Sequence, residues 1–289
     1  MEIAVLTMVH NEADHLRAWI KYYEPLAGRE NLYIIAHGGD ENIVQIALGC
    51  RVIYLPRKKV DWRFDKLRMR VINAYAAYLI NNYDCVVSGD VDELVFADPD
   101  VAPTLRDFIQ LGHKEKVLTT FGFHLMCDGS EDGYNPLLVP TAQRNLAILD
   151  GHYCKPLICF AEPEWTKGFH SCMHGFSMPV GLYMAHTRCA SLEIERSVAE
   201  GRRESVGGFD NLGSTHLQRF WERHDLVCVR RRRALQKSTI YELDDVIDML
   251  RSDLRDGFTN GRFAERAIFS PGQIRAIRLP ERFRRVAAA

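Results

Sequence analysis

The 289-residue chain lacks the features that define several large classes of protein. No apolar run approaches the roughly 18 residues that span a bilayer, and Met1 leads directly into a strand-like segment instead of a signal sequence. Lys and Arg number 37 against 38 Asp and Glu, so the formal net charge of −1 provides no overall positive field for nucleic acid. We therefore predict a cytoplasmic protein with no nucleic-acid partner.

The chain also lacks the cysteine spacing of a disulfide-rich protein. Its eight cysteines are scattered, and most lie inside apolar runs such as LGCRVIYL. In a reducing compartment such cysteines are typically free, buried thiols. We therefore expect no disulfide framework.

Strand-like and helix-like segments alternate along the first hundred residues. Residues 3–9 and 32–36 are short apolar runs, and between them Leu16, Trp19, Ile20 and Tyr23 recur at helical spacing. Residues 64–82 carry a second periodic pattern, which predicts a helix with an apolar face formed by Leu67, Val71, Ile72, Tyr75, Tyr78 and Leu79. This alternation predicts an α/β fold, with a mixed, mostly parallel sheet flanked by helices.

Three carboxylates follow the apolar segment Cys85-Val86-Val87, in the stretch CVVSGDVDELVF. In an open α/β sheet, ligands bind beyond the carboxyl ends of the strands, where Asp90, Asp92 and Glu93 would lie. Acids this close repel one another unless a cation compensates them, and an extended Asp90-Val91-Asp92 lets both aspartates face one way. The pattern favours Mg²⁺ or Mn²⁺ completed by substrate phosphates. The alternative is a solvated acidic turn or a helix N-cap.

Three segments, LTMVHNEADHLRAWIKYY, FDKLRMRVINAY and YDCVVSGDVDELV, resemble nucleotide-sugar glycosyltransferases of the GT-A fold. The likeness is to the family-2-like branch with an N-E…W…Y-Y opening and a D-x-D-E metal motif, and it continues more loosely to about residue 203. It implies a Rossmann-like GT-A catalytic domain over residues 1–190. Within it, residues 1–100 would bind the nucleotide and residues 101–190 would complete the acceptor and metal sites, followed by a helical C-terminal extension over residues 191–289.

The resemblance also implies roles for individual residues. Asp90 and Asp92 would hold Mn²⁺ or Mg²⁺ on the diphosphate of the donor, and Glu93 would support the metal site or touch the sugar. The nucleotide base and ribose would be met by His10, Asn11, Glu12 and Asp40. Lys66 and Arg70 would reach the phosphates or orient Asp90. Simpler alternatives are a helix N-terminus for Asn11 and Glu12, and a solvated face for Lys66 and Arg70.

The second half of the chain offers candidates for a general base and a further metal ligand. Inverting sugar transfer needs a carboxylate base, for which the loop CDGSEDGYNP provides Asp128, Glu131 and Asp132, and Glu164 is another candidate. An ordinary turn accounts equally well for these acids. By the same resemblance, His186 or His170 would complete the metal shell, and Lys155 would contact a phosphate or the sugar. Neutral structural histidines and a surface lysine are the alternatives.

The leading hypothesis is a metal-dependent, inverting glycosyltransferase of polysaccharide biosynthesis, with a nucleoside-diphosphate sugar as donor and a UDP-sugar favoured. The acceptor would be a glycan or a lipid-linked sugar, and the basic C-terminal region, including Arg230 to Arg233, suggests peripheral contact with a membrane. Two alternatives stay open. One is a sugar nucleotidyltransferase, although MVHNEAD lacks the glycine-rich, basic phosphate cradle that such chemistry uses. The other is a non-catalytic protein that binds nucleotide or glycan.

Overall fold

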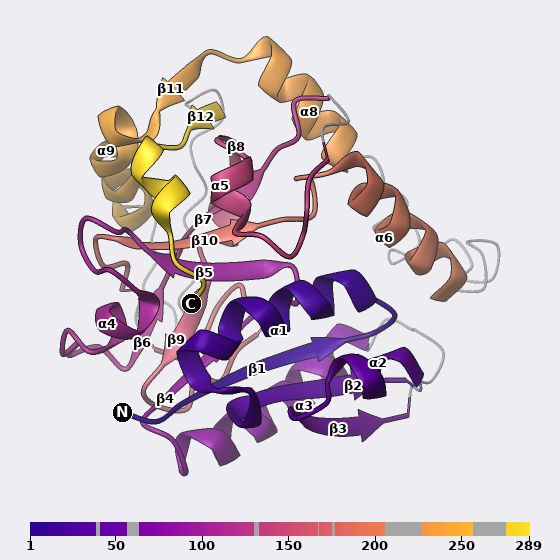
Figure 1. The fold of residues 1–289 in the computed structure, drawn as a ribbon. Helices are drawn as coiled ribbons and strands as arrows, with labels where there is room; N and C mark the ends of the chain where they lie inside the picture. The colour runs from indigo at the N-terminus through magenta and orange to yellow at the C-terminus, as the bar shows by residue number, and fades with distance from the viewer. Residues whose placement is uncertain are drawn as a thin grey trace.

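The structure is a computed structural model that describes residues 1–38, 41–56, 64–129, 133–166, 168–174, 177–205, 227–256 and 276–289. Its strands form two six-stranded sheets (Figure 1). The first sheet has the order β3-β2-β1-β4-β9-β6. Its strands are β1 (Ile3–Val9), β2 (Leu32–His37), β3 (Arg51–Leu55), β4 (Cys85–Ser88), β6 (Val117–Thr119) and β9 (Pro156–Cys159). β1 to β4 run parallel, and β9 is antiparallel to both of its neighbours.

Helices cover this sheet as the alternation predicts, and the α/β class with a mixed sheet flanked by helices is confirmed. They are α1 (Ala13–Ala27), η1 (Arg29–Asn31), α2 (Glu41–Ile46) and α3 (Phe64–Ile80). The predicted apolar face of α1 is correct, since Leu16, Trp19, Ile20 and Tyr23 are all buried. The Tyr23 hydroxyl also accepts a hydrogen bond from the backbone N–H of Val95, at 2.9 Å, so α1 holds the strand that follows the acidic cluster.

The predicted apolar face of α3 is correct in part: Ile72 and Leu79 are buried, and Val71 and Tyr75 are partly buried against the core. Leu67 and Tyr78 are 49% and 60% exposed. The residues that pack inward are Met69, Ile72, Ala76 and Leu79. The side chains of Leu67 and Tyr78 are larger than that of Ala76, and the sequence pattern follows their size, whereas the buried face uses the small alanine for close helix–sheet contact. Arg68, beside Met69, contacts Asp90 of the acidic cluster.

The second sheet has the order β11-β12-β8-β7-β10-β5. Its strands are β5 (Glu93–Ala97), β7 (Phe121–Leu125), β8 (Leu146–Leu149), β10 (Leu182–His186), β11 (Ile240–Glu242) and β12 (Ala276–Arg278). β10 lies between β5, to which it is antiparallel, and β7, to which it is parallel, while β7 and β8 pair antiparallel. A separate core of aromatic residues fills one side of this sheet, with Phe96, Phe121, Phe123, Tyr183 and Phe283 among its members.

The described part of the chain after residue 190 contains the helices α6 (Leu192–Ser205), α8 (Val227–Lys237) and α9 (Leu243–Asp256). It also contributes β11 and β12 to the second sheet, and Phe283 of η4 (Glu281–Arg285) enters the aromatic core. The region after residue 190 therefore shares a core with residues 93–186. The remaining short helices are α4 (Leu105–Ile109), α5 (Pro140–Gln143) and η2 (Gly151–Tyr153).

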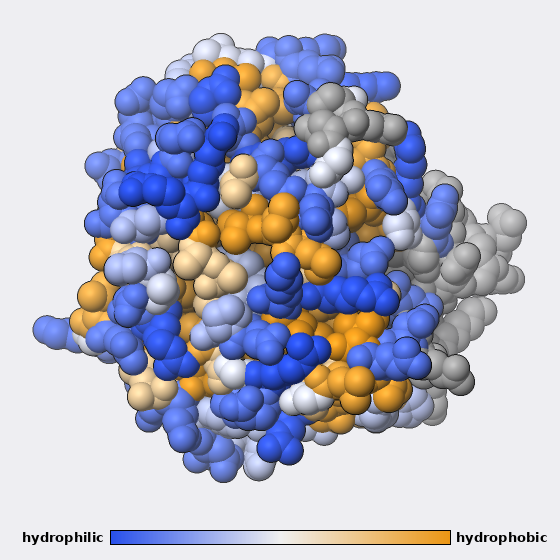
Figure 2. All heavy atoms as spheres, in the orientation of Figure 1, coloured by the Kyte–Doolittle hydropathy of each residue, from blue (hydrophilic) through white to orange (hydrophobic). Residues whose placement is uncertain are grey.

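Two further sequence expectations concern the surface and the cysteines. Within the described ranges, no helix has both the length and the apolar character needed to cross a membrane. On the face shown in Figure 2, apolar side chains form patches separated by hydrophilic ones.

The expectation of free thiols is wrong for one pair, because Cys189 and Cys228 form a disulfide. These residues lie 39 positions apart without a recognisable motif, and α8 brings them together beside the end of β10.

Candidate functional site

The acidic cluster lies where the chain passes from the first sheet to the second. β4 ends at Ser88 and β5 begins at Glu93, so Asp90 and Asp92 occupy the short connection between the sheets. This connection borders a cavity of 1550 Å³. The predicted site residues on the wall of the cavity are His10, Asn11, Glu12, Lys66, Arg70, Asp90, Asp92, Glu93, Lys155, His170 and His186.

Asp90 lies between two cationic side chains. Its Oδ1 accepts a hydrogen bond from Arg68 of α3, and its Oδ2 lies 3.3 Å from the Nζ of Lys155. Burial raises the pKa of Asp90, but Arg68 and Lys155 outweigh burial and lower the pKa below its ordinary value. Asp90 is therefore ionised and already neutralised by the protein.

Glu93 and Lys155 form a buried ion pair next to Asp90. The Lys155 ammonium donates to the Glu93 carboxylate, and both side chains are almost completely shielded from solvent. Burial raises the pKa of Glu93 to about 7, against the opposing effect of Lys155. Burial lowers the pKa of Lys155, but Glu93 and Asp90 outweigh it and raise that pKa, so the ammonium stays protonated. The alternative that Lys155 is an ordinary surface lysine is excluded, because only 1% of this residue is exposed.

Asp92 has a different set of neighbours. Its Oδ2 lies 3.2 Å from Nε2 of His186, the last residue of β10. Burial raises the pKa of Asp92, but His186 and His15 outweigh burial and hold the pKa well below its ordinary value. Asp90 and Asp92 are thus both ionised, but their neighbours differ: Asp90 faces fixed cations, whereas Asp92 faces an imidazole.

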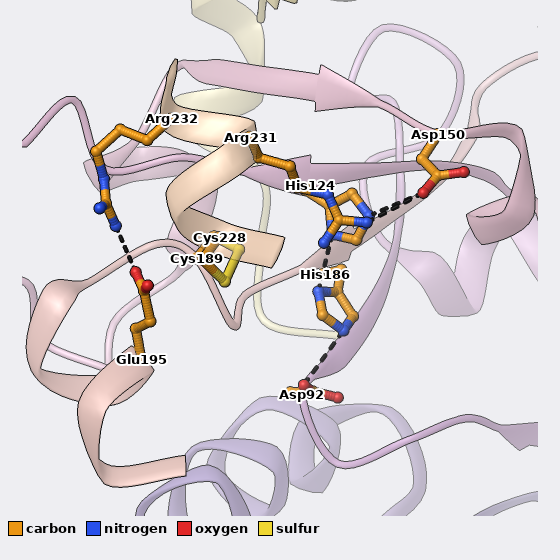
Figure 3. Close-up of a disulfide and its surroundings, with 9 residues drawn as sticks. All are labelled: Asp92, His124, Asp150, His186, Cys189, Glu195, Cys228, Arg231 and Arg232. Atoms are coloured by element: carbon orange, nitrogen blue, oxygen red, sulfur yellow. Dashed lines mark hydrogen bonds and ion pairs between the residues drawn. A yellow bond between two sulfur atoms is a disulfide. The ribbon is translucent and has the colours of Figure 1, made fainter. Parts of the chain in front are cut away.

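The second sheet places three side chains in a row behind Asp92 (Figure 3). His186 pairs with His124 across β10 and β7, and their Nδ1 atoms lie 3.0 Å apart. His124 Nε2 lies 3.7 Å from Oδ2 of Asp150, which directly follows β8. The four strands β5, β10, β7 and β8 therefore bring Asp92, His186, His124 and Asp150 together. We call this set the histidine row.

Asp150 is held at the far end of the histidine row by basic groups. Arg231 of α8 donates to its Oδ2 at 3.0 Å, and Nδ1 of His152 lies 3.0 Å from its Oδ1. Burial raises the pKa of Asp150, but the contacts with His124 and His152 outweigh burial and lower the pKa far below its ordinary value. The disulfide fixes α8 to the segment just after His186 (Figure 3). Arg232 of the same helix forms an ion pair with Glu195 of α6.

The remaining predicted residues are placed as follows. Asn11 has a left-handed backbone (φ 50°), which asparagine tolerates, and Glu12 lies 3.3 Å from His15. Lys66 and Arg70 are exposed at the edge of the cavity, and the contact with Asp90 that was expected from them is made by Arg68 instead. Nδ1 of His170 lies 2.5 Å from the carbonyl oxygen of His152.

The general-base candidates gain no support from position. Asp128 and Glu164 are exposed and neither is among the residues that line the cavity. Asp40, Glu131 and Asp132 lie outside the described residues. The assignments of Asp128, Glu131 and Asp132 as base candidates therefore stay predictions, as does the nucleotide contact assigned to Asp40.

Sequence reasoning missed Arg68, His124, Asp150 and Arg231. Arg68 could have been recognised from the sequence, because it lies one helical turn from Asp65, between the predicted cations Lys66 and Arg70 and next to Met69. The other three carried none: they become neighbours through strand pairing and the position of α8, across separations of 62 and 81 residues.

The residues present can be tested against a divalent metal. Among the residues that the structure describes, no group of three or more His, Cys, Asp and Glu side chains is arranged as a metal cage. Mg²⁺ and Mn²⁺ are usually held by one or two carboxylates together with substrate phosphates, so a complete protein cage is not required. The ionised Asp92 and the adjacent Nε2 of His186 on the cavity wall fit such a partial site.

Comparisons with known proteins leave the family open. No family model and no curated protein sequence matches the chain. Among solved structures, a cytidylyltransferase from Leptospira borgpetersenii is 12% identical with a TM-score of 0.26, over 47% of this chain and 58% of that one. A mannose-1-phosphate geranyltransferase from Thermus thermophilus is also 12% identical, with a TM-score of 0.29, over 77% of this chain and 68% of that one.

A third similar structure is a glycosyltransferase involved in the glycosylation of the major capsid of PBCV-1. It is 10% identical with a TM-score of 0.24, over 95% of each chain. This chain spans less than two thirds of the cytidylyltransferase. TM-scores this low support no argument about function, so the case for function has to be made from the site itself.

Proposed function

We propose that this protein is a metal-dependent glycosyltransferase of the GT-A type. It would transfer a sugar from a nucleoside-diphosphate sugar, with a UDP-sugar favoured, to a glycan or lipid-linked acceptor, with inversion. The observation that supports this proposal best is the pairing of Asp92 with His186 beside a neutralised Asp90, at the carboxyl end of a central parallel strand. In α/β sheets this is the position where ligands bind.

The size of the cavity agrees with two substrates. Pockets for single small ligands typically measure about 300–1,000 Å³, and this cavity of 1550 Å³ exceeds that range. Its wall includes the turn after β1, where His10 and Asn11 would meet the nucleotide, and also residues of α6 and Arg231 of α8. A donor beside His10 and Asn11 would leave the part beside α6 and Arg231 for an acceptor.

Asp92 and His186 would hold the metal, which when bound supplies positive charge to the departing diphosphate. The chain itself supplies further positive charge through Arg68 and Lys155, which both border the cavity. Because their charge is partly offset by Asp90 and Glu93, they would orient the diphosphate more than they attract it. Asp150 also borders the cavity, but its strongly lowered pKa makes it a poor base for an acceptor hydroxyl.

The proposal is tested by incubating the protein with Mn²⁺ and a panel of UDP-, GDP- and CDP-sugars. Slow release of nucleoside diphosphate, and its loss on removal of the metal by a chelator, is the expected result. Asp92→Asn should abolish both this release and metal-dependent nucleotide binding. Asp244→Asn is the matched control, since Asp244 pairs with Arg282 away from the cavity and its loss should change neither.

Other results would point to the alternatives. Release of pyrophosphate from a nucleoside triphosphate and a sugar phosphate would identify a nucleotidyltransferase. Binding of nucleotide without any turnover across the panel would favour the non-catalytic reading. Metal-dependent binding that survives Asp92→Asn would remove Asp92 from the site. The contact of the basic C-terminal region with membranes stays a prediction, although Arg231 and Arg232 are engaged inside the protein.

A further inference from the structure

The histidine row contains fewer protons than contacts. The side chains of His124 and His186 are both buried and their Nδ1 atoms are 3.0 Å apart, and because two N–H groups cannot face each other at this distance, at most one Nδ1 is protonated. A histidine that binds a metal must be neutral, and so must a ring whose Nδ1 accepts a hydrogen bond and whose only proton is on Nε2. A neutral imidazole carries one N–H, and the two rings therefore supply two protons. The row has three contacts to fill: Asp92 with His186, His186 with His124, and His124 with Asp150.

The central contact fixes how these protons can be arranged. The two Nδ1 atoms are 3.0 Å apart, so one of them must donate to the other. If His124 donates, its Nε2 is bare and His186 turns Nε2–H toward Asp92. If His186 donates, its own Nε2 is bare and His124 turns Nε2–H toward Asp150. The two rings are thus coupled, and only one end of the row can lack a proton.

The two ends of the histidine row differ in geometry. The contact of His186 Nε2 with Asp92 is 3.2 Å, whereas the contact of His124 Nε2 with Asp150 is 3.7 Å. A metal at Asp92 needs the arrangement with the proton on the Asp150 side, because a histidine ligand must present a lone pair.

We propose that His124 and Asp150 are positioning residues for His186, and that they give it the tautomer that a metal on Asp92 requires. When His186 presents Nε2 to the metal, its Nδ1–H is accepted by His124, whose Nε2–H is accepted in turn by Asp150. This inference rests on the proposed function. Outer partners of this kind commonly change metal affinity by about 10- to 100-fold when they are mutated.

Asp150 suits this role because it remains an acceptor. Arg231 and His152 hold it ionised and in place, with contacts of 3.0 Å each. Arg231 is itself carried by the helix that the disulfide fixes beside His186 (Figure 3). Without Asp150, the Nε2–H of His124 would be left buried and unpaired, at a cost comparable to a lost hydrogen bond.

Two substitutions at His124 separate this role from simple packing. His124→Phe keeps a ring against Tyr153, whose centroid lies 4.0 Å away, but cannot accept the Nδ1–H of His186. His124→Asn packs worse but carries a carbonyl oxygen at the position of Nδ1. We expect Mn²⁺ titrated calorimetrically to bind His124→Phe about 10- to 100-fold more weakly than wild type, and His124→Asn to recover most of that loss. A packing role predicts the reverse order.

A second measurement needs no metal and no activity. Long-range ¹H–¹⁵N correlation spectra of the metal-free protein should show one pyrrole-type and one pyridine-type nitrogen in each ring, with only one Nδ1 protonated. Two protons on either ring would overturn the inference. Equal Mn²⁺ affinity in wild type and in His124→Phe would overturn the inference while the proposed function stands. Wild type that binds no Mn²⁺, alone or with a nucleoside diphosphate, would overturn the proposed metal site and this inference with it.

Discussion

The ammonium of Lys155 contacts the carboxylate of Glu93 where neither side chain reaches solvent. Lys155 precedes β9 of the first sheet, and Glu93 begins β5 of the second, so this ion pair joins the two sheets directly under the candidate site. Buried charges cost several kcal/mol each to remove from water, and the cost is recovered only if they stay paired. The pair should therefore respond strongly to removal of either partner.

Removing the lysine should destabilise the protein in a pH-dependent way. Lys155→Met leaves Glu93 buried without its cation, which typically costs about 3–5 kcal/mol. The loss should be smaller in acid, because Glu93 can then be protonated. Adding Glu93→Gln to Lys155→Met should recover part of the stability at neutral pH. Chemical denaturation of the single and double variants measures this, and equal stability of the two at neutral pH would contradict it.

Glu93 alone should give stability a pH slope. Its pKa rises from 4.5 in the unfolded chain to about 7 in the folded protein, so the folded state binds the proton more tightly. Its contribution to stability is therefore fully present below pH 4.5 and is lost as the pH rises to about 7. The stability of wild type relative to Glu93→Gln should fall across this interval by up to about 3 kcal/mol. Denaturation midpoints at a series of pH values measure it, and a pH-independent difference would show that Glu93 does not titrate there.

The disulfide should contribute measurable stability. It closes a segment of 39 residues, for which the chain-entropy relation gives about 4 kcal/mol, with typical values of about 2–4. A reducing agent should therefore lower the unfolding temperature of wild type but not that of Cys189→Ser. Cys50→Ser is the matched control and should respond to reduction as wild type does, since Cys50 is only half-buried and distant in sequence. An unfolding temperature that is insensitive to reduction in wild type would exclude the bond in solution.

Gly122 of β7 should tolerate no side chain. A Cβ at this position would lie 1.9 Å from the carbonyl oxygen of Tyr153, which is backbone and cannot rotate away. Gly122→Ala adds one methyl group and should therefore destabilise the protein by at least the roughly 1–3 kcal/mol that is typical of overpacking. It should also displace the segment that carries Tyr153 and Lys155. Thermal unfolding close to that of wild type would contradict this close approach.

The first half of the fold could be predicted from the sequence because its signals are local. The strand at residues 3–9, the helix that follows it and the acids after Val87 each lie in a continuous pattern, and the structure places them as expected. Two positions of the predicted apolar face of α3, Leu67 and Tyr78, are exposed, and the contact with Asp90 that the resemblance assigned to Lys66 and Arg70 is made by Arg68.

The second half could not be predicted to the same depth. β11 and β12 have three residues each, too few for an alternating pattern to appear. The histidine row depends on the register of β10 with β7 and of β7 with β8, and register is set by tertiary packing that no local pattern records. His186 was found by resemblance, whereas His124 and Asp150 needed the paired strands.

The connection from β4 to β5 divides its two aspartates between the sheets. Asp90 is anchored through Arg68 and Lys155 to elements of the first sheet, and Asp92 through His186 to a strand of the second. Any tilt of one sheet against the other must therefore change the separation of the two carboxylates. The distance between Asp90 and Asp92 therefore depends on how the two sheets pack against each other. A substitution far from the cavity that changes this packing will change that distance.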